Sequence, residues 1–406
     1  MKVGVYFVGY SPKKGGGHSF EQEILLSLCE LAQQCRHELV LFFENAPGDD
    51  ILTIIAEKGL KVVLLEPLLS VSILQRVVSK ILREFHLPSP SETLHPLRAA
   101  LEREKVELIW FAADSYVPVE EVDAPYIATV WDIQHCLQPW FPEVSQSGEW
   151  QWREKFYFPF LRRAAYILTP NVVGQKELSL FYGLPPGRFR LLPHPSPRIE
   201  NVPDEEKVNG VLARYHLARG YLFYPAGFWP HKNHANLLIA LQVLKNKFGQ
   251  NKHLVLVGSN KGNLEYIRNL AQTLGLEGQV HFLDFIPRDD LIALYHGAFA
   301  LTYLSLFGPE NMPPLEAFKC GCPVIVSDYS GAKQQLGDAA LFVNGLDPDA
   351  IAKAIQELER QQELRLALIE KGRQRAVRYS GEAYTRDVFK IFDEFEPVRR
   401  SWGSTY

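Results

Sequence analysis

The sequence predicts an α/β chain in which two doubly wound parallel-sheet domains face a shared cleft. Short apolar runs alternate with helical patterns over most of the 406 residues, which is typical of parallel sheets joined by right-handed crossovers. The alternation stops at the polar segment 193–219, which predicts an interdomain linker, and then restarts. We therefore expect one domain over residues 1–200 and a second over residues 201–380.

In the first half, the predicted strands are apolar runs, and helical patterns fill the intervals between them. Strands are expected at residues 3–8, 38–43, 61–65, 108–111, 126–130, 166–169 and 189–192. The clearest helical patterns cover residues 20–34 and 149–163.

The second half repeats the alternation and then becomes helical. Strands are expected at residues 221–225, 253–257, 280–283, 299–303 and 324–326. From Pro348 onward helical patterns dominate and end with residues 382–395.

Composition is that of a globular protein and argues against a nucleic-acid partner. Apolar residues make up 47% and charged residues 22% of the chain, and the formal charge of −4 lacks the basic excess of a nucleic-acid binder. Five scattered cysteines do not suggest a disulfide framework and fit a reducing compartment. No apolar run reaches the roughly 18 residues needed to span a bilayer, and the chain does not open like a signal peptide. We expect a cytoplasmic protein.

The segment 303–328, YLSLFGPENMPPLEAFKCGCPVIVSD, is the most informative part of the chain. Pro313 and Pro314 predict a helix start, because the N–H that proline lacks would be unpaired in the first turn. Glu316 is expected within that turn, where the helix dipole favours a carboxylate or a phosphate. Gly321 predicts the end of the helix. The loop thus offers N–H groups and a fixed carboxylate, which suits an anionic, hydroxyl-rich ligand such as a nucleotide sugar.

Three glycines, Gly15, Gly16 and Gly17, separate the first predicted strand from a helix. Glycine lets the backbone take positive φ and approach a ligand, while the helix N-terminus supplies donors for a phosphate. Lys13 and Lys14 add positive charge. The G-x-G-x-x-G spacing of dinucleotide-binding folds is absent, and the alternative is a flexible surface loop.

A second loop, GFWPHKNH at residues 227–234, follows the first strand of the second predicted domain. Lys232 is placed to neutralise a phosphate leaving group as a point charge. Asn233 is placed to cap the helix that follows. The alternative for Lys232 is a solvated lysine at a helix start.

The sequence WDIQH at residues 131–135 follows a predicted strand. Residues just past the carboxyl ends of parallel strands line the ligand crevice of open α/β sheets. Asp132 and His135 are therefore candidates for handling donor or acceptor hydroxyls, and His135 could exchange a proton.

Two patterns that resemble metal sites have a simpler structural interpretation. Asp347 and Asp349 have Asp-x-Asp spacing, but Asp347 before Pro348 is a natural N-cap, which we favour. Cys320 and Cys322 lack a second ligand pair at zinc-site spacing, so we interpret them as packing residues. We predict no metal site.

Residues 71–85 place their apolar side chains on one helical face. Such a face can contact a membrane peripherally or hold an acceptor, although it more often packs into a core.

Taken together, these motifs resemble family 4 of the retaining glycosyltransferases, which have two facing Rossmann-like domains in the GT-B architecture. The resemblance extends over nearly the whole chain and is strongest at residues 221–343, where PPLEAFKCGCPVIVSD is its most specific piece. DIQHCLQPWF at residues 132–141 resembles the segment that shapes the acceptor side. YSGE at residues 379–382 resembles the start of a final helix that crosses back, which implies that residues 381–406 pack on the first domain.

The resemblance also implies residue roles. Glu316 matches the second glutamate of the family's Glu-x7-Glu signature, which binds the donor ribose. Lys232 matches the lysine that contacts the donor diphosphate. Gly16 and Gly17 match the glycine loop that closes over that diphosphate.

The substrates follow from the same resemblance. Residues 284–286, which include Phe285 and Ile286, match the place where the base is read, largely by backbone. The implied donor is a UDP, GDP or ADP sugar, and the acceptor is a glycan, a lipid-linked molecule or a small molecule. The resemblance implies no cofactor and no bound metal.

The chain departs from the family pattern at two places. Gly308 stands where the first signature glutamate belongs, and the nearest carboxylate is Glu310. We expect Glu310, Asn311 and the backbone at Met312 to address the sugar hydroxyls and the β-phosphate instead. Phe228 stands near the position of an arginine that usually accompanies the lysine.

Three functions are compatible with these features. The first is retaining sugar transfer, in which positioning and charge stabilisation by Lys232 and backbone dipoles carry catalysis. The second, motivated by Gly308 and Phe228, is a non-catalytic nucleotide-sugar-binding protein. The third, a nicotinamide-dependent oxidoreductase, is disfavoured by the missing glycine fingerprint and the lack of an acidic residue in register after it.

Overall fold

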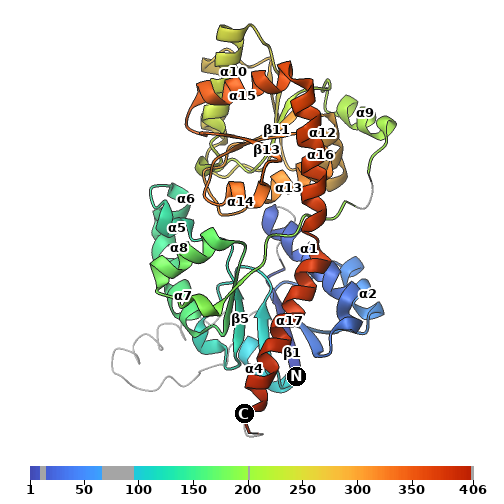
Figure 1. Ribbon diagram of the computed structural model, residues 1–406, viewed down its shortest axis with the longest axis vertical. Coiled ribbons are helices and arrows are strands. Elements are labelled where there is room, and N and C mark those ends of the chain that lie inside the picture. The colour runs from blue at the N-terminus through green and yellow to red at the C-terminus, as the bar shows by residue number, and fades with distance from the viewer. Residues whose placement is uncertain (10–14, 66–95, 200–201, 404–406) are drawn as a thin grey trace, which may run out of the picture.

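The protein has two lobes in a computed structural model that describes residues 1–9, 15–65, 96–199 and 202–403. The earlier part of the chain, blue to green, forms the lower lobe in Figure 1, and the later part, yellow to orange, forms the upper lobe. Lys13, Lys14 and the amphipathic pattern at residues 71–85 lie outside the described residues.

The first lobe is built on a seven-stranded parallel sheet with the order β3-β2-β1-β4-β5-β6-β7. Its strands are β1 (Lys2–Phe7), β2 (Glu38–Phe43), β3 (Lys61–Leu64), β4 (Leu108–Phe111), β5 (Tyr126–Thr129), β6 (Tyr166–Thr169) and β7 (Phe189–Leu191). The direction of winding reverses between β1 and β4. In open α/β sheets, the carboxyl ends of the strands at such a point form the ligand crevice.

The second lobe has a six-stranded parallel sheet with the order β10-β9-β8-β11-β12-β13. Its strands are β8 (Leu222–Pro225), β9 (Leu254–Val257), β10 (Val280–Leu283), β11 (Ala300–Tyr303), β12 (Val324–Ser327) and β13 (Ala340–Val343). Its winding reverses between β8 and β11, so each lobe has its own switch point.

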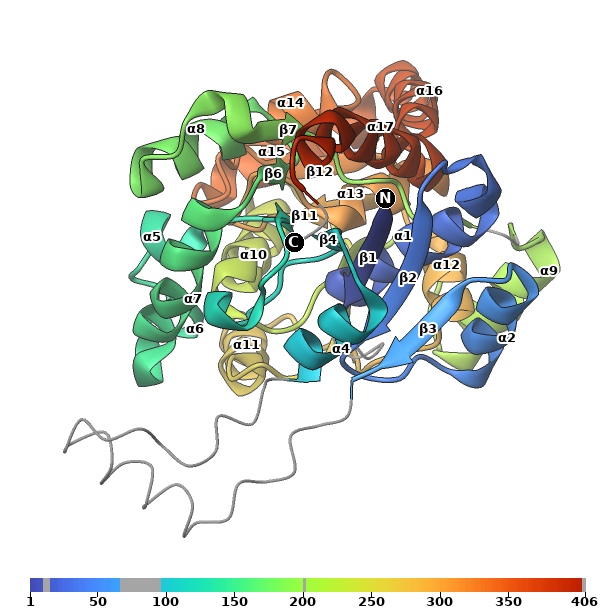
Figure 2. The same ribbon diagram turned by 90° about the horizontal axis from the view of Figure 1, so that it is seen from below.

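Helices cover both faces of each sheet (Figure 2). In the first lobe they are α1 (Gly16–Leu31), α2 (Asp49–Glu57), α4 (Pro96–Glu104), α5 (Gln134–Leu137), α6 (Pro142–Ser145), α7 (Glu149–Arg163) and α8 (Val172–Tyr182). In β2, Leu41 packs with α1 and α2, whereas Val40 and Phe42 pack with α4 and α7, because successive strand residues point to opposite faces.

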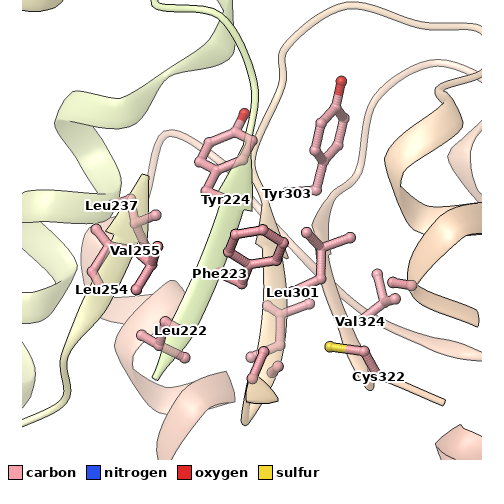
Figure 3. Close-up of a cluster of buried hydrophobic side chains, with 14 of the residues drawn as sticks. Leu222, Phe223, Tyr224, Leu237, Leu254, Val255, Leu301, Tyr303, Cys322 and Val324 are labelled. Atoms are coloured by element: carbon pink, nitrogen blue, oxygen red, sulfur yellow. The ribbon is translucent and has the colours of Figure 1, made fainter. Parts of the chain in front are cut away.

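The helices of the second lobe follow the same plan. They are α9 (Glu205–Arg214), α10 (His234–Phe248), α11 (Leu264–Thr273), α12 (Arg288–Gly297), α13 (Met312–Lys319), α14 (Ala332–Leu336), α15 (Pro348–Arg360) and α16 (Gln362–Arg378). The core between them consists of strand residues such as Leu222, Leu254 and Leu301, which are fully buried (Figure 3). Tyr224 and Tyr303 lie at the carboxyl ends of β8 and β11 and direct their hydroxyls out of this cluster at the same end (Figure 3).

The last helix returns to the first lobe. After α16 packs on the second lobe, α17 (Gly381–Arg400) runs down the first lobe against α1 (Figure 1). Tyr384, Val388 and Phe392 of α17 share one buried cluster with Val5 of β1 and Trp110 of β4. The final helix is therefore part of the hydrophobic core of the first lobe.

Every predicted strand is present, with ends shifted by no more than one residue. The secondary structure differs from the prediction at two places. The segment 193–219 is not an irregular linker throughout, because it contains α9, whose N-terminus is capped by the Asp204 side chain accepting from the Lys207 N–H. The strand β13 was not among the predicted strands, although its residues Ala340–Val343 are all apolar.

Among the described residues, no helix combines the length and apolarity required to cross a membrane.

Candidate active site

A cavity of about 390 Å³ lies between the lobes at the carboxyl ends of both sheets. Loops after β1, β5 and β7 form one side, and loops after β8 and β11 together with α13 form the other. The lining residues from the first lobe are Gly15, Gly16, Gly17, Ser19, Phe20, Trp131, Asp132 and His194. Those from the second lobe are Pro225, Ala226, Gly227, Trp229, His231, Lys232, Leu291, Tyr303, Glu310, Asn311, Met312, Pro313 and Glu316.

The glycine loop opens α1 at the cavity wall. Gly15 is the N-cap with φ of 67°, a conformation that favours glycine, and no side chain caps the helix. Gly16 and Gly17 are the first helical residues, so their N–H groups have no intrahelical partners. A Cβ on Gly16 would meet the Met312 Cγ of the other lobe at 3.8 Å, an ordinary contact. The loop thus presents free donors and partial positive charge to the cavity.

Lys232 is positioned by hydroxyl groups. It ends the short 3₁₀ helix η6 (Pro230–Lys232), and its Nζ donates to the Tyr303 hydroxyl at 2.8 Å and to the Ser305 Oγ at 3.3 Å. In the part of the chain that the structure describes, no carboxylate forms an ion pair with this ammonium group. Its charge is therefore available to an anion in the cavity.

The helix α13 begins beside Lys232 and carries Glu316. Pro313 and Pro314 occupy its first turn as predicted, but the helix begins at Met312, so Glu316 is its fifth residue. The prediction that Glu316 lies in the first turn was therefore wrong. Its carboxylate accepts from the Tyr295 hydroxyl at 3.0 Å and still lines the cavity.

Asn311 has no free polar atom on its side chain. Its Oδ1 accepts from the Tyr303 hydroxyl at 2.8 Å, and its Nδ2 donates to the Phe307 carbonyl at 2.8 Å. Asn311 thereby fixes the loop ahead of α13 and links it to the hydroxyl that holds Lys232.

The structure explains why Gly308 replaces the expected glutamate. A Cβ at Gly308 would lie 2.1 Å from the Ser330 carbonyl oxygen, so the loop admits no side chain there. Glu310 is buried between the lobes, where its carboxylate accepts from the Asn171 Nδ2 at 3.2 Å and the His194 N–H at 2.9 Å. Burial nevertheless raises the pKa of Glu310 to about 8. This carboxyl is therefore tied to the first lobe and holds a proton at neutral pH.

Only one of the two polar candidates after β5 lines the cavity. Asp132 does so, and its Oδ1 accepts from the Gln134 N–H at 2.9 Å. His135 is fully buried outside the lining, with Nε2 at 2.8 Å from the Glu154 Oε1 and its ring stacked on Tyr157. Burial lowers the pKa of His135. The structure therefore does not place His135 where it can exchange a proton with a ligand in the cavity.

Among the described residues, His135, Cys136 and Glu154 are the group whose ligand atoms lie close enough together to hold a metal, within 4.8 Å of one another. Two observations favour a hydrogen-bonded cluster instead. The Tyr182 hydroxyl already donates to the Glu154 Oε1 at 2.5 Å. The His135 Nδ1 has no partner among the described residues, whereas a metal-bound histidine normally donates its second N–H.

Three further predicted site residues, Phe285, Ile286 and Asn233, do not lie or bond as expected. Phe285 is half exposed, Ile286 is buried, and neither lines the cavity, although Leu291 of the following helix does. Asn233 occupies the N-cap position of α10 without capping it. Its Nδ2 instead donates to the carbonyls of Leu304 and Gly345, which ties the Lys232 loop to two other loops.

Side chains of the first lobe hold the loop before α13 and the Lys232 loop. Gln134 Nε2 donates to the Gly308 carbonyl at 3.0 Å. Glu143 Oε1 accepts from both the backbone N–H and Nδ1 of His231, at 3.0 and 2.5 Å. Burial and the neighbouring Lys232 lower the pKa of His231 to about 4, so the imidazole is neutral and Nδ1–H is the donor.

Sequence reasoning missed His194 and the aromatic residues beside it. The segment with His194 was assigned to the linker, although it follows the carboxyl end of β7 and therefore meets the same positional criterion as Asp132. Phe20 and Trp131 were also not singled out as wall residues, because an aromatic side chain by itself does not distinguish cavity from core.

Comparison with known proteins agrees with this geometry. Residues 218–375 match the family Glycosyl transferases group 1. The O-antigen chain mannosyltransferase B of Escherichia coli is 28% identical over 303 residues, which are 74% of this chain and 78% of that protein. The O-antigen chain mannosyltransferase RfbU of Salmonella typhimurium is 27% identical over 211 residues, 51% of this chain and 56% of that protein.

Solved structures with the same fold include a glycosyltransferase from Rickettsia africae, with a TM-score of 0.68, 14% identity, and coverage of 97% of this chain and 98% of that one. Anabaena Alr3699/HepE in complex with UDP and glucose has a TM-score of 0.66 and 16% identity, covering 97% of this chain and 99% of that one. The structural matches show the GT-B fold, and the sequence matches show that the chain is an enzyme of the glycosyltransferase class.

Proposed function

We propose that the protein is a retaining, metal-independent glycosyltransferase of family 4 that moves a hexose from a nucleoside-diphosphate sugar to an acceptor hydroxyl. The observation that carries this proposal is that the Lys232 ammonium group and the Glu316 carboxylate line one cavity, opposite the uncapped N-terminus of α1. A cation with free helix donors suits a diphosphate, and a carboxylate suits the two hydroxyls of a ribose.

The donor would extend along the cavity in a defined order. Glu316, held by Tyr295, would accept hydrogen bonds from the ribose hydroxyls, with the base beyond it toward the segment 284–286. The diphosphate would lie between Lys232 and the glycine loop, against the Met312 N–H at the start of α13, because Pro313 and Pro314 have no N–H. This order leaves the sugar beyond the diphosphate, on the side away from the ribose.

Chemistry would rest on leaving-group stabilisation. The bond from the anomeric carbon to the β-phosphate oxygen breaks, and its electron pair stays on the diphosphate, which Lys232 and the helix N-termini stabilise. The acceptor oxygen attacks the same face of the sugar, and its proton passes to the departing phosphate oxygen. Asp132 would orient the acceptor hydroxyl. His135 would support the acceptor side only through Glu154 and Tyr157.

The relatives narrow the substrate class. Two of them are O-antigen mannosyltransferases, which supports a mannosyl donor and a growing polysaccharide, lipid-linked or free, as acceptor. We place the reaction in the cytoplasm, where nucleotide sugars are available, with the acceptor reaching the enzyme at the inner face of the membrane.

The test is a thermal-shift screen against UDP, GDP, ADP and their common hexose derivatives, followed by product analysis. A ligand at 100 times its Kd should raise the stability by about 2.7 kcal/mol. Transfer from the stabilising donor to a polysaccharide acceptor should give a product with the anomeric configuration of the donor, at a rate that EDTA does not change. Inversion, or loss of activity in EDTA, would refute the corresponding part of the proposal.

A non-catalytic nucleotide-sugar-binding protein is the second candidate, favoured by a specific observation. Phe228 is buried and stacks on His234 at 4.8 Å, so the position near the family's arginine belongs to the core and leaves Lys232 without that cationic neighbour. Stabilisation by a nucleotide sugar with neither transfer nor hydrolysis over a broad acceptor panel would select this candidate.

A further inference from the structure

His194 occupies an unusual position in the cavity wall. It follows β7 and lines the cavity, and only 7% of the residue's surface is exposed. Neither ring nitrogen has a hydrogen-bond partner among the described residues. Buried polar atoms of this kind are rare in folded proteins because each unpaired group costs free energy, so the position calls for a ligand.

The charge state of His194 restricts that ligand. Burial lowers the pKa of the imidazole to about 4, so at neutral pH it offers one N–H donor and one acceptor nitrogen. An ionised phosphate provides only acceptors and is better matched by Lys232. A hydroxyl group both donates and accepts, and a sugar carries several hydroxyls on one rigid ring.

The surroundings of His194 also fit a sugar. Its ring meets Phe20 edge-on at 5.2 Å and Trp131 at 6.5 Å between centroids, so the imidazole and its two buried nitrogens pack among aromatic rings of the wall. Sugar sites commonly combine an apolar surface for the C–H groups with a few fixed polar atoms. The His194 backbone N–H donates to Glu310, which anchors the residue to the loop that leads into α13.

We propose that the two ring nitrogens of His194 hydrogen-bond hydroxyl groups of the sugar carried by the donor, which makes His194 a sugar-binding and specificity-determining residue. This inference rests on the proposed function. The backbone hydrogen bond to Glu310, two residues before Met312, would put the imidazole next along the donor after the diphosphate, where the transferred sugar has to lie.

The experiment compares the wild type with His194→Phe, which keeps an aromatic ring but has no nitrogens, and with His194→Ala. Titration calorimetry measures the Kd of a nucleoside diphosphate and of its hexose derivative, using the pair among UDP/UDP-glucose, GDP/GDP-mannose and ADP/ADP-glucose that stabilises the wild type most. We expect both variants to bind the free diphosphate within about twofold of wild type. We expect them to bind the sugar derivative roughly 5- to 100-fold more weakly, as the loss of two neutral hydrogen bonds predicts.

A second measurement identifies the hydroxyls. Among donors that each lack one sugar hydroxyl, at least one should lose roughly 3- to 10-fold in kcat/KM with the wild type and show no further loss with His194→Phe. The matched control is His296→Phe, because His296 also has a buried unpartnered Nε2 but does not line the cavity. Its affinities should equal those of the wild type.

Two results would overturn the inference while leaving the proposed function intact. The first is an unchanged affinity of His194→Phe for the sugar derivative, which would show that the nitrogens meet only water. The second is an equal loss for the free diphosphate and the sugar derivative, which would make His194 a support of the cavity. If the wild type binds no nucleotide sugar, the proposed function itself fails.

Discussion

Lys232 is the residue on which the proposed leaving-group chemistry depends most. Its ammonium group is held by two hydroxyls, and no carboxylate of the described residues pairs with it, so its charge can act on the proposed diphosphate. Lys232→Ala should therefore reduce kcat by on the order of 10²–10³, the usual cost of removing one preorganised electrostatic contact.

A radiolabelled-sugar transfer assay measures this loss, and Lys247→Ala is the control because Lys247 forms an exposed ion pair with Asp349 at the C-terminal end of α10 and does not line the cavity. Near-normal turnover of Lys232→Ala would assign the leaving-group contact to another residue.

Glu310 should give the protein a measurable pH dependence. The folded pKa of about 8 lies above the ordinary value of 4.5, so the folded state keeps a proton that the unfolded state releases. The stability conferred by the neutral carboxyl is complete below pH 4.5 and declines as the pH rises through 8, by up to about 1.4 kcal/mol per unit.

Glu310→Gln cannot ionise at this position. The free energy of unfolding, measured by urea denaturation from pH 5 to pH 8, should therefore shift in favour of the variant as the pH rises. A difference between the two proteins that does not vary with pH would show that the carboxyl is ionised in the folded state.

At the scale of single elements, the start of α15 distinguishes two roles for Asp347, helix capping and metal binding. The Asp347 side chain accepts from the Ala350 N–H at 3.0 Å, as an N-cap does, and Pro348 begins the helix. Asp347→Ala should lower the free energy of unfolding by about 0.5–2 kcal/mol and leave kcat unchanged, whereas Asp347→Asn should retain the stability. Loss of activity in Asp347→Asn would favour a metal ligand.

The elements also show where sequence patterns suffice. Strands such as β4 and β9 are continuous apolar runs, because helices cover both faces of a parallel sheet, and such runs can be found directly. The helix α9 was missed because it lies in a charged segment with Pro203 and Gly210, and its helical state depends on the Asp204 cap and on burying Val208 and Leu212 against the second lobe.

At the scale of the whole molecule, the contact between Glu143 and His231 joins the lobes. Burial opposes ionisation of Glu143, but the hydrogen bonds from His231 hold the pKa of its carboxyl below the usual value. Because His231 immediately precedes Lys232, Glu143→Ala should release the Lys232 loop, open the cleft and raise the KM for the donor by roughly threefold to tenfold.

Small-angle scattering of the ligand-free protein should show a larger radius of gyration for this variant. Glu149→Ala is the matched control, because Glu149 lies nearby but pairs with Arg153 of its own helix. An unchanged radius of gyration together with an unchanged KM would mean that the other interlobe contacts hold the cleft by themselves.

The sequence by itself determined the two-sheet plan, the loops after β1, β8 and β11, and the choice of Lys232 and Glu316 as candidates, both of which line the cavity. These follow from local patterns, because apolar runs, glycines and prolines act over a few residues. Only the tertiary structure decided that His135 is buried away from the cavity while His194, from a segment assigned to the linker, lines it. Residues far apart in the chain meet through packing between the lobes, and their separation in the sequence does not specify how close they lie in the fold.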